Sequence, residues 1–159
     1  RVQTALAGPT TRVYLPELRF IEVYNRTTGG RYRVDVESTD ELFFLKLPPG
    51  EYEVNRIMIH EGAFQAMANL APTFQVSGEA LNYIGTWRFG VDSPQYGRMV
   101  VVTVVSELDQ AAAEAIARYP GWSGHPILTQ LPEPAISESR LYEVPPYPRI
   151  WWFRRHHTF

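Results

Sequence analysis

The sequence predicts a mainly β protein: a seven-stranded antiparallel β-sandwich of immunoglobulin-like or transthyretin-like kind, one C-terminal helix and an extended Pro-rich arm. Short segments alternate apolar and polar residues, as Arg31 to Glu37 does, and turn-forming residues separate them. The arm is predicted because seven of the 13 Pro residues fall between Pro120 and Pro148, where no strand or helix period is visible. The predicted divisions are an irregular N-terminal segment over residues 1–17, the sandwich over 18–105, the helix over 106–120 and the arm over 121–159.

Seven segments have the composition of strands. The fourth changes the parity of its apolar residues between Val54 and Ile57, which predicts a bulge near Asn55-Arg56. The last contains the run Met-Val-Val-Val-Thr-Val-Val, which is typical of a central strand covered on both faces. Residues 61–72 and 90–97 are expected to be loops. The predicted strands are Leu18 to Asn25, Arg31 to Glu37, Leu42 to Leu47, Glu51 to Ile59, Thr73 to Ser77, Leu81 to Phe89 and Arg98 to Val105.

Two glycines have predicted structural roles. Pro48-Pro49-Gly50 predicts a tight turn that joins the third and fourth strands into a hairpin, since Pro fixes φ near −65° and Gly accepts positive φ. Gly85, in the middle of the sixth strand, is expected to make room for a bulky neighbour.

The helix is predicted from its cap and its apolar stripe. Ser106 is a suitable N-cap residue with Asp109 three positions later, and Pro120-Gly121 ends the helix. The stripe is expected to pack on the sandwich. It consists of Leu108, Ala112, Ala115, Ile116 and Tyr119.

Composition excludes several classes of function. The net charge of −2 argues against nucleic acid as the main partner, and the absence of Cys excludes disulfides and thiol chemistry. No apolar run is long enough to span a bilayer. The sequence begins at Arg1 rather than Met, which fits either a removed secretory leader or a chain that starts later in a longer protein.

Chemical motifs are weak. His60-Glu61, His125 and the adjacent His156-His157 lack metal-ligand spacing, and Ser77-Gly78-Glu79 and Ser123-Gly124-His125 read as turns rather than as nucleophile sites. We therefore expect no metal, no cofactor and no enzymatic activity.

Aromatic residues carry more information. Tyr83 and Trp87 share a strand face, which favours a core position; the alternative is a binding face for a glycan or small molecule, with the loops of residues 61–72 and 90–97. In the arm, Trp and Arg residues are typical of interface anchors, although packing on the parent domain or contact with anionic lipid head groups would use them as well. The predicted partner-binding residues are Trp122, Tyr147, Arg149, Trp151, Trp152, Phe153, Arg154, Arg155 and Phe159.

The sequence also resembles a known group of domains. Phe44-Leu-Lys-Leu-Pro-Pro-Gly-Glu-Tyr-Glu-Val54, followed by Gly78-Glu-Ala-Leu-Asn-Tyr-Ile-Gly-Thr86, is similar to the bacterial lipoprotein-type domains of the DUF2846 group and to the carboxypeptidase regulatory-like (transthyretin-like) sandwiches. The resemblance covers roughly residues 12–105 and implies a non-catalytic envelope module. The lipobox Cys of a lipoprotein is absent from this chain.

These observations predict a non-catalytic, extracytoplasmic accessory subunit. It would be a structural protein of the periplasm or cell envelope, peripheral to the membrane and without a transmembrane segment. Its C-terminal arm would dock on other subunits of a larger, membrane-associated complex, and nucleic acid would not be a partner. The alternative function is a glycan or small-molecule binding module that uses Tyr83 and Trp87.

Overall fold

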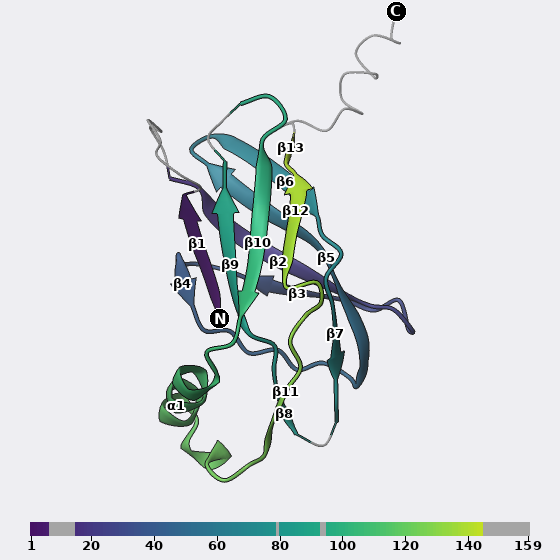
Figure 1. Ribbon diagram of the computed structural model, residues 1–159, viewed down its shortest axis with the longest axis vertical. Coiled ribbons are helices and arrows are strands. Elements are labelled where there is room, and N and C mark those ends of the chain that lie inside the picture. Colours follow the sequence, from purple (N-terminus) through teal and green to yellow (C-terminus); the bar gives the residue numbers. More distant parts are fainter. Residues whose placement is uncertain (7–14, 79, 93–94, 145–159) are drawn as a thin grey trace, which may run out of the picture.

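The computed structural model describes residues 1–6, 15–78, 80–92 and 95–144, and its fold is mainly β with one α-helix (Figure 1). Thirteen strands, rather than the seven predicted, form within these ranges. The strands are β1 Val2–Leu6, β2 Glu17–Asn25, β3 Arg31–Asp35, β4 Asp40–Glu41, β5 Gly50–Glu61, β6 Phe64–Asn69, β7 Thr73–Val76, β8 Leu81–Tyr83, β9 Thr86–Val91, β10 Met99–Val105, β11 Ile127–Thr129, β12 Ile136–Arg140 and β13 Tyr142–Glu143; α1 is Leu108–Arg118 and the 3-10 helix η1 is Pro120–Trp122.

Two large sheets lie over one another with the core between them (Figure 1). The first has the order β12-β10-β9-β1-β4, and the second has the order β13-β6-β5-β2-β3, with β7 also paired to β5. A separate two-stranded sheet joins β11 and β8 in parallel at the end of the molecule that carries α1.

Consecutive strands link the two sheets at both edges. At one edge β3 of the second sheet leads to β4 of the first, and at the other edge β12 of the first leads to β13 of the second. The chain therefore passes from one sheet to the other at both edges.

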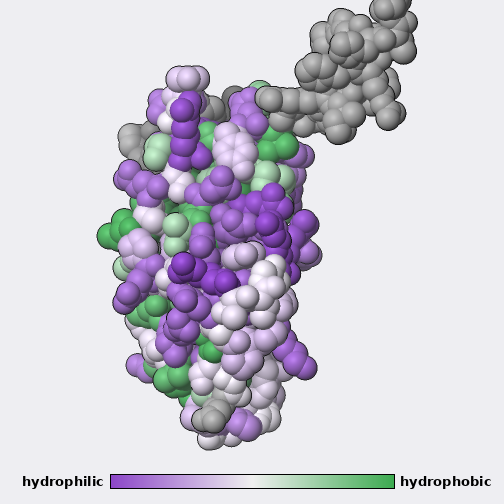
Figure 2. Space-filling view, turned by 90° about the vertical axis from the view of Figure 1, so that its right-hand side faces the viewer, coloured by the Kyte–Doolittle hydropathy of each residue, from purple (hydrophilic) through white to green (hydrophobic). Residues whose placement is uncertain are grey.

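The core is continuous and combines aliphatic and aromatic side chains. Ile57, Ile59 and Phe89 are completely buried and Trp87 is 2% exposed. Period-two alternation produces this core, because every second residue of β5, β9 and β10 faces inward. Figure 2 shows hydrophilic side chains over much of one side of the molecule.

The predicted bulge is confirmed. Along β2 and β5, Glu22 is opposite Arg56 but Val23 is opposite Val54, so Asn55 is the additional residue. The buried positions of β5 shift accordingly from Tyr52 and Val54 to Ile57 and Ile59. The extra residue keeps both apolar pairs on the core side of one long strand.

The predicted hairpin at residues 48–50 is wrong. β5 begins at Gly50, but its first residues pair with β2 on one side and with β7 on the other, so no edge is left for residues 42–47. Phe43 to Leu47 form no backbone hydrogen bond with another described residue. Phe43, Leu45 and Leu47 nevertheless pack on the core, because alternate side chains of an extended segment face the same way.

Four further predictions need correction. The predicted loop over residues 61–72 contains β6, whose Ala66, Met67 and Ala68 are buried. The predicted strand over residues 81–89 divides into β8 and β9. β10 is central, as predicted, but only one of its faces is fully buried. The N-terminal segment is not irregular throughout, because β1 pairs in parallel with β9.

Gly85 explains the division between β8 and β9. Its φ is +93°, and a Cβ at this position would lie 2.7 Å from Val104 Cγ1. The predicted close approach of a bulky side chain is thus confirmed, but the positive φ turns the chain and ends the strand.

The helix starts two residues later than predicted. Glu107, not Ser106, occupies the N-cap position, and no side chain caps the helix. The Glu107 carboxylate binds Thr86 Oγ1 and Arg88 instead, and the Glu107 N–H donates to Tyr83 Oη at 2.7 Å. Contacts with β9 and β8 thus fix the start of the helix.

Residues 121–144 do not form a separate arm. β11 pairs with β8, β12 pairs with β10 and β13 pairs with β6, and Leu141 is buried. β12 was not predicted because it contains polar residues such as Ser137 and Glu138, and an edge strand needs few apolar residues.

Candidate functional site: an apolar pocket beside the helix

A pocket of about 630 Å³ opens at the end of the molecule that carries α1. The extended residues 42–47 form one wall, α1 and η1 form a second, and β8 with the residues that flank it forms a third. The lining is mostly apolar. Its main apolar members are Leu42, Phe43, Phe44, Leu45, Leu47, Phe74, Val76, Leu81, Ile84, Leu108, Ala111, Ala112, Ala115, Tyr119, Trp122 and Ile127.

The apolar stripe of α1 faces this pocket. Leu108, Ala112 and Ala115 recur at helical spacing and all line it, whereas in α1 only Ala111 is classed as fully buried. We expected the stripe to pack directly on the sandwich. The short Ala side chains leave space between the helix and residues 42–47, and that space is the pocket.

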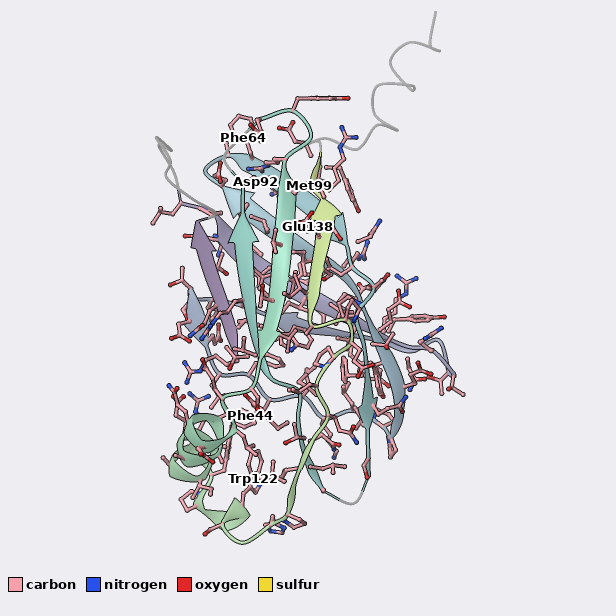
Figure 3. The ribbon with its side chains drawn as sticks, in the orientation of Figure 1. Phe44, Phe64, Asp92, Met99, Trp122 and Glu138 are labelled. Atoms are coloured by element: carbon pink, nitrogen blue, oxygen red, sulfur yellow. The ribbon has the colours of Figure 1, made fainter. Side chains whose placement is uncertain are left out.

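Three aromatic rings form the outer wall. Phe44 meets the rings of Tyr119 and Trp122 edge to face at centroid distances of 5.1 and 5.2 Å, and Tyr119 stacks on Trp122 at 4.5 Å. Figure 3 shows Phe44 and Trp122 beside α1, at the opposite end of the molecule from Phe64. Trp122, predicted as a partner-binding residue, therefore belongs to the pocket.

The polar side chains that line the pocket differ in whether they are already hydrogen-bonded or ion-paired within the protein. The side chain of Asn82 is occupied by the loop, since it bonds the backbone of Ser77 and Ala80. Arg1 pairs with Asp40 and Glu114, and the hydrogen bond to Asp40 raises the pKa of its guanidinium. Lys46 forms no ion pair with another described residue.

Tyr83 and Trp87 do not share a binding face. Tyr83 lines the pocket, but Trp87 lies in the core, as the favoured prediction had it. Its Nε1 donates to the Ile84 carbonyl at 2.6 Å, and its ring packs against Phe43 and Phe74. The turn at Gly85 separates the two residues, so Trp87 offers no open surface to a glycan.

The other predicted partner-binding residues lie outside the described part of the chain. They are Tyr147, Arg149, Trp151, Trp152, Phe153, Arg154, Arg155 and Phe159. The adjacent His156 and His157 lie outside it as well.

Sequence reasoning missed Phe44 and Lys46 because their segment was assigned to a strand. A signal was present in the helix, where an unusual number of Ala residues occupy the apolar stripe. That pattern allows close packing, but it allows a cavity equally well.

The described part of the chain shows neither a metal-binding cluster nor a membrane-spanning helix. Within the described ranges, His, Asp and Glu side chains do not gather in groups of three or more that could hold a metal ion. None of the helices in those ranges has the length and apolar character needed to cross a bilayer.

Comparison with protein-family models, with curated proteins and with solved structures gave no match.

Proposed function

We propose that this protein is a non-catalytic binding module that holds an apolar small molecule in the pocket between α1 and residues 42–47. The observation that carries the proposal is the pocket itself. Its volume of about 630 Å³ falls in the range of about 300–1,000 Å³ that is usual for small-molecule sites.

The composition of the pocket suits such a ligand. Phe44 and Tyr119 are 37% and 42% exposed without a ligand, whereas the core residues Phe74, Trp87 and Phe89 are at most 3% exposed. Removing apolar surface from water stabilises a complex by about 25 cal/mol per Å². A ligand between the aromatic wall and α1 would bury these rings.

The test is the binding of a neutral apolar probe, decan-1-ol, measured by titration calorimetry below its solubility limit. Ala112→Phe places a ring in the pocket from the helix and is expected to weaken binding at least about tenfold. Ala113→Phe is the matched control, because Ala113 is exposed and does not line the pocket. Equal binding by both variants, or no binding by the unmodified protein, would contradict the proposal.

We also propose that the protein docks on a larger assembly. Residues 145–159 contain Trp151-Trp152 and three Arg residues, a composition typical of interface anchors. This composition supports an accessory subunit that binds a ligand in the pocket and attaches to a larger, membrane-associated assembly through residues 145–159. We propose in addition that the protein is extracytoplasmic and that its sandwich is of the transthyretin-like or immunoglobulin-like type. A relationship to the DUF2846 group is part of the same proposal.

Its test is deletion of residues 145–159. The thirteen strands of the described residues end before this segment, so the melting temperature is expected to stay within a few degrees of the unmodified protein. Association with envelope proteins, measured by pull-down from solubilised membranes, is expected to be lost. Retained association would contradict the docking role and leave the pocket proposal unaffected.

A further inference from the structure

We infer that the ligand is an amphiphile with an anionic head group of the carboxylate class, which pairs with Lys46 while its apolar part fills the pocket. This inference rests on the proposed function and adds a chemical class to it.

The charges around the pocket favour an anion. Arg1 and Lys46 line the pocket, and among the described residues no Asp or Glu does. The whole chain has a net charge of −2, whereas the charged side chains of the pocket lining are both cationic, and Arg1 is already paired with Asp40 and Glu114. An anionic group entering here is attracted to Lys46, whereas a cationic group would be repelled by it.

The two cations are not equivalent. Arg1 already bonds to the carboxylates of Asp40 and Glu114. Lys46 has no such partner among the described residues, and it is the only lysine among the 15 cationic side chains of the sequence. A ligand carboxylate would therefore pair with Lys46 without displacing an existing ion pair.

The position of Lys46 follows from the packing of its segment. Phe43, Leu45 and Leu47 pack against the core, and the alternate residues Phe44 and Lys46 are exposed. Phe44 belongs to the aromatic wall, so Lys46 lies on the same side, two residues further along the extended chain. The ammonium group on its flexible stem can reach a head group at the mouth of the pocket.

Further donors line the same pocket. Tyr83 Oη accepts a hydrogen bond from the Glu107 N–H at 2.7 Å, which leaves the phenolic proton available for an acceptor. The backbone N–H groups of residues 43–47 donate to no other described residue. A carboxylate accepts hydrogen bonds only, so it complements a site that offers donors.

The experiment compares three ligands that share one chain and differ in the head group: decanoate and decyltrimethylammonium below their micelle concentrations, and decan-1-ol below its solubility limit. We expect decanoate to bind about three- to fivefold more tightly than decan-1-ol, which is the effect of one partly exposed ion pair. The cationic ligand should bind most weakly. About 0.5 M salt should remove most of the advantage of decanoate.

Variants assign the effect to Lys46. Lys46→Gln is expected to abolish the difference between decanoate and decan-1-ol, and Lys46→Arg is expected to retain it. Arg19→Gln removes one exposed positive charge outside the pocket and is expected to retain it as well. Loss of the difference in Arg19→Gln, or its survival in Lys46→Gln, would overturn the inference.

Chemical labelling gives an independent measurement. Lys46 is the only side-chain amine, so its acetylation by an amine-reactive ester can be followed on a single peptide by mass spectrometry. Decanoate is expected to slow this reaction about threefold or more, and decan-1-ol is not, at matched occupancy. Equal affinity or equal protection for both ligands would overturn the anionic head group and leave the pocket proposal standing. Failure of all three ligands to bind would overturn the pocket proposal itself.

Discussion

Apolar side chains are used differently in the sandwich and at the end that carries α1. In the sandwich, Ile57, Ile59, Trp87 and Phe89 are at most 2% exposed. In α1, by contrast, only Ala111 is buried. Leu108, Ala112 and Ala115 line a cavity. Protein interiors are normally packed as densely as organic crystals, so the contrast marks the helix end as a place where apolar surface is not used for folding alone.

The difference between the sandwich core and the pocket predicts that one set of residues affects the stability of the fold and the other affects ligand binding. A core side chain contributes through the contacts that it makes in the folded protein, and its removal leaves a void. A pocket side chain makes fewer contacts until a ligand arrives. Variants in the sandwich should therefore change the melting curve, and variants in the pocket should change affinity. The predictions below test this separation, from the largest expected effect to the smallest.

Trp87→Ala is expected to lower the free energy of unfolding by roughly 3–5 kcal/mol, because the indole fills the core between Phe43 and Phe74 and its Nε1 bonds Ile84. The measurement is denaturant unfolding followed by circular dichroism. A melting curve close to that of the unmodified protein would place Trp87 outside the core.

Gly50→Val is expected to cost about 1–3 kcal/mol. The φ of Gly50 is +151°, and a Cβ would lie 3.2 Å from Asn25 Nδ2, so the substitution combines backbone strain with crowding. Gly121→Val is the control, because nothing lies within 4 Å of a Cβ there; its effect should stay within about 0.5 kcal/mol. Similar losses in both variants would show that the backbone conformation at Gly50 is not restrictive.

Glu22→Gln tests a buried charge on the sandwich. The Glu22 side chain is 9% exposed and accepts hydrogen bonds from Asn55 at 2.8 Å and from Arg56 at 3.1 Å, and Arg31 lies 3.2 Å away. Burial alone would raise the pKa of Glu22, but these hydrogen bonds and positive charges outweigh it and lower the pKa below 4.5. We expect the substitution to cost about 1–2 kcal/mol at pH 7.

The lowered pKa of Glu22 also fixes the direction of the pH dependence. The ionised carboxylate stabilises the fold fully above pH 4.5, and this contribution is lost as the pH falls through the lower pKa of the folded state. The unmodified protein should therefore lose more stability than Glu22→Gln when the pH is lowered from 6 to about 3. Parallel losses in both proteins would show that Glu22 does not contribute.

Trp122→Ala should have the smallest effect on stability, about 1 kcal/mol or less, because the ring is only partly buried in the aromatic wall. Its effect on decan-1-ol binding should be larger, about three- to tenfold, since the ligand would lose one wall of the pocket. A loss of stability as large as that of Trp87→Ala, with unchanged binding, would show that the two regions do not differ in the way described.

Much of the sandwich could be predicted from local pattern. The alternation in β3 and β5 predicted their inward faces, and the parity change after Val54 located the bulge at Asn55. The predictions failed where strand composition was treated as strand pairing. Residues 42–47 have an apolar pattern suited to a strand, but β2 and β7 occupy both edges of the β5 segment beside them. β12 has a polar pattern, yet it pairs with β10.

The sequence by itself determined which residues of β3, β5 and β9 face inward, because side-chain direction within a strand follows the local period of the backbone. It determined the mainly β class and the helix for the same reason. The tertiary structure decided which strand edges meet, and it turned the Ala-rich stripe of α1 toward a cavity shared with Phe44 and Lys46. Strand pairing and the position of the helix depend on competition between distant segments for the same strand edge or sheet face. A local sequence pattern does not show which segment occupies that edge or face.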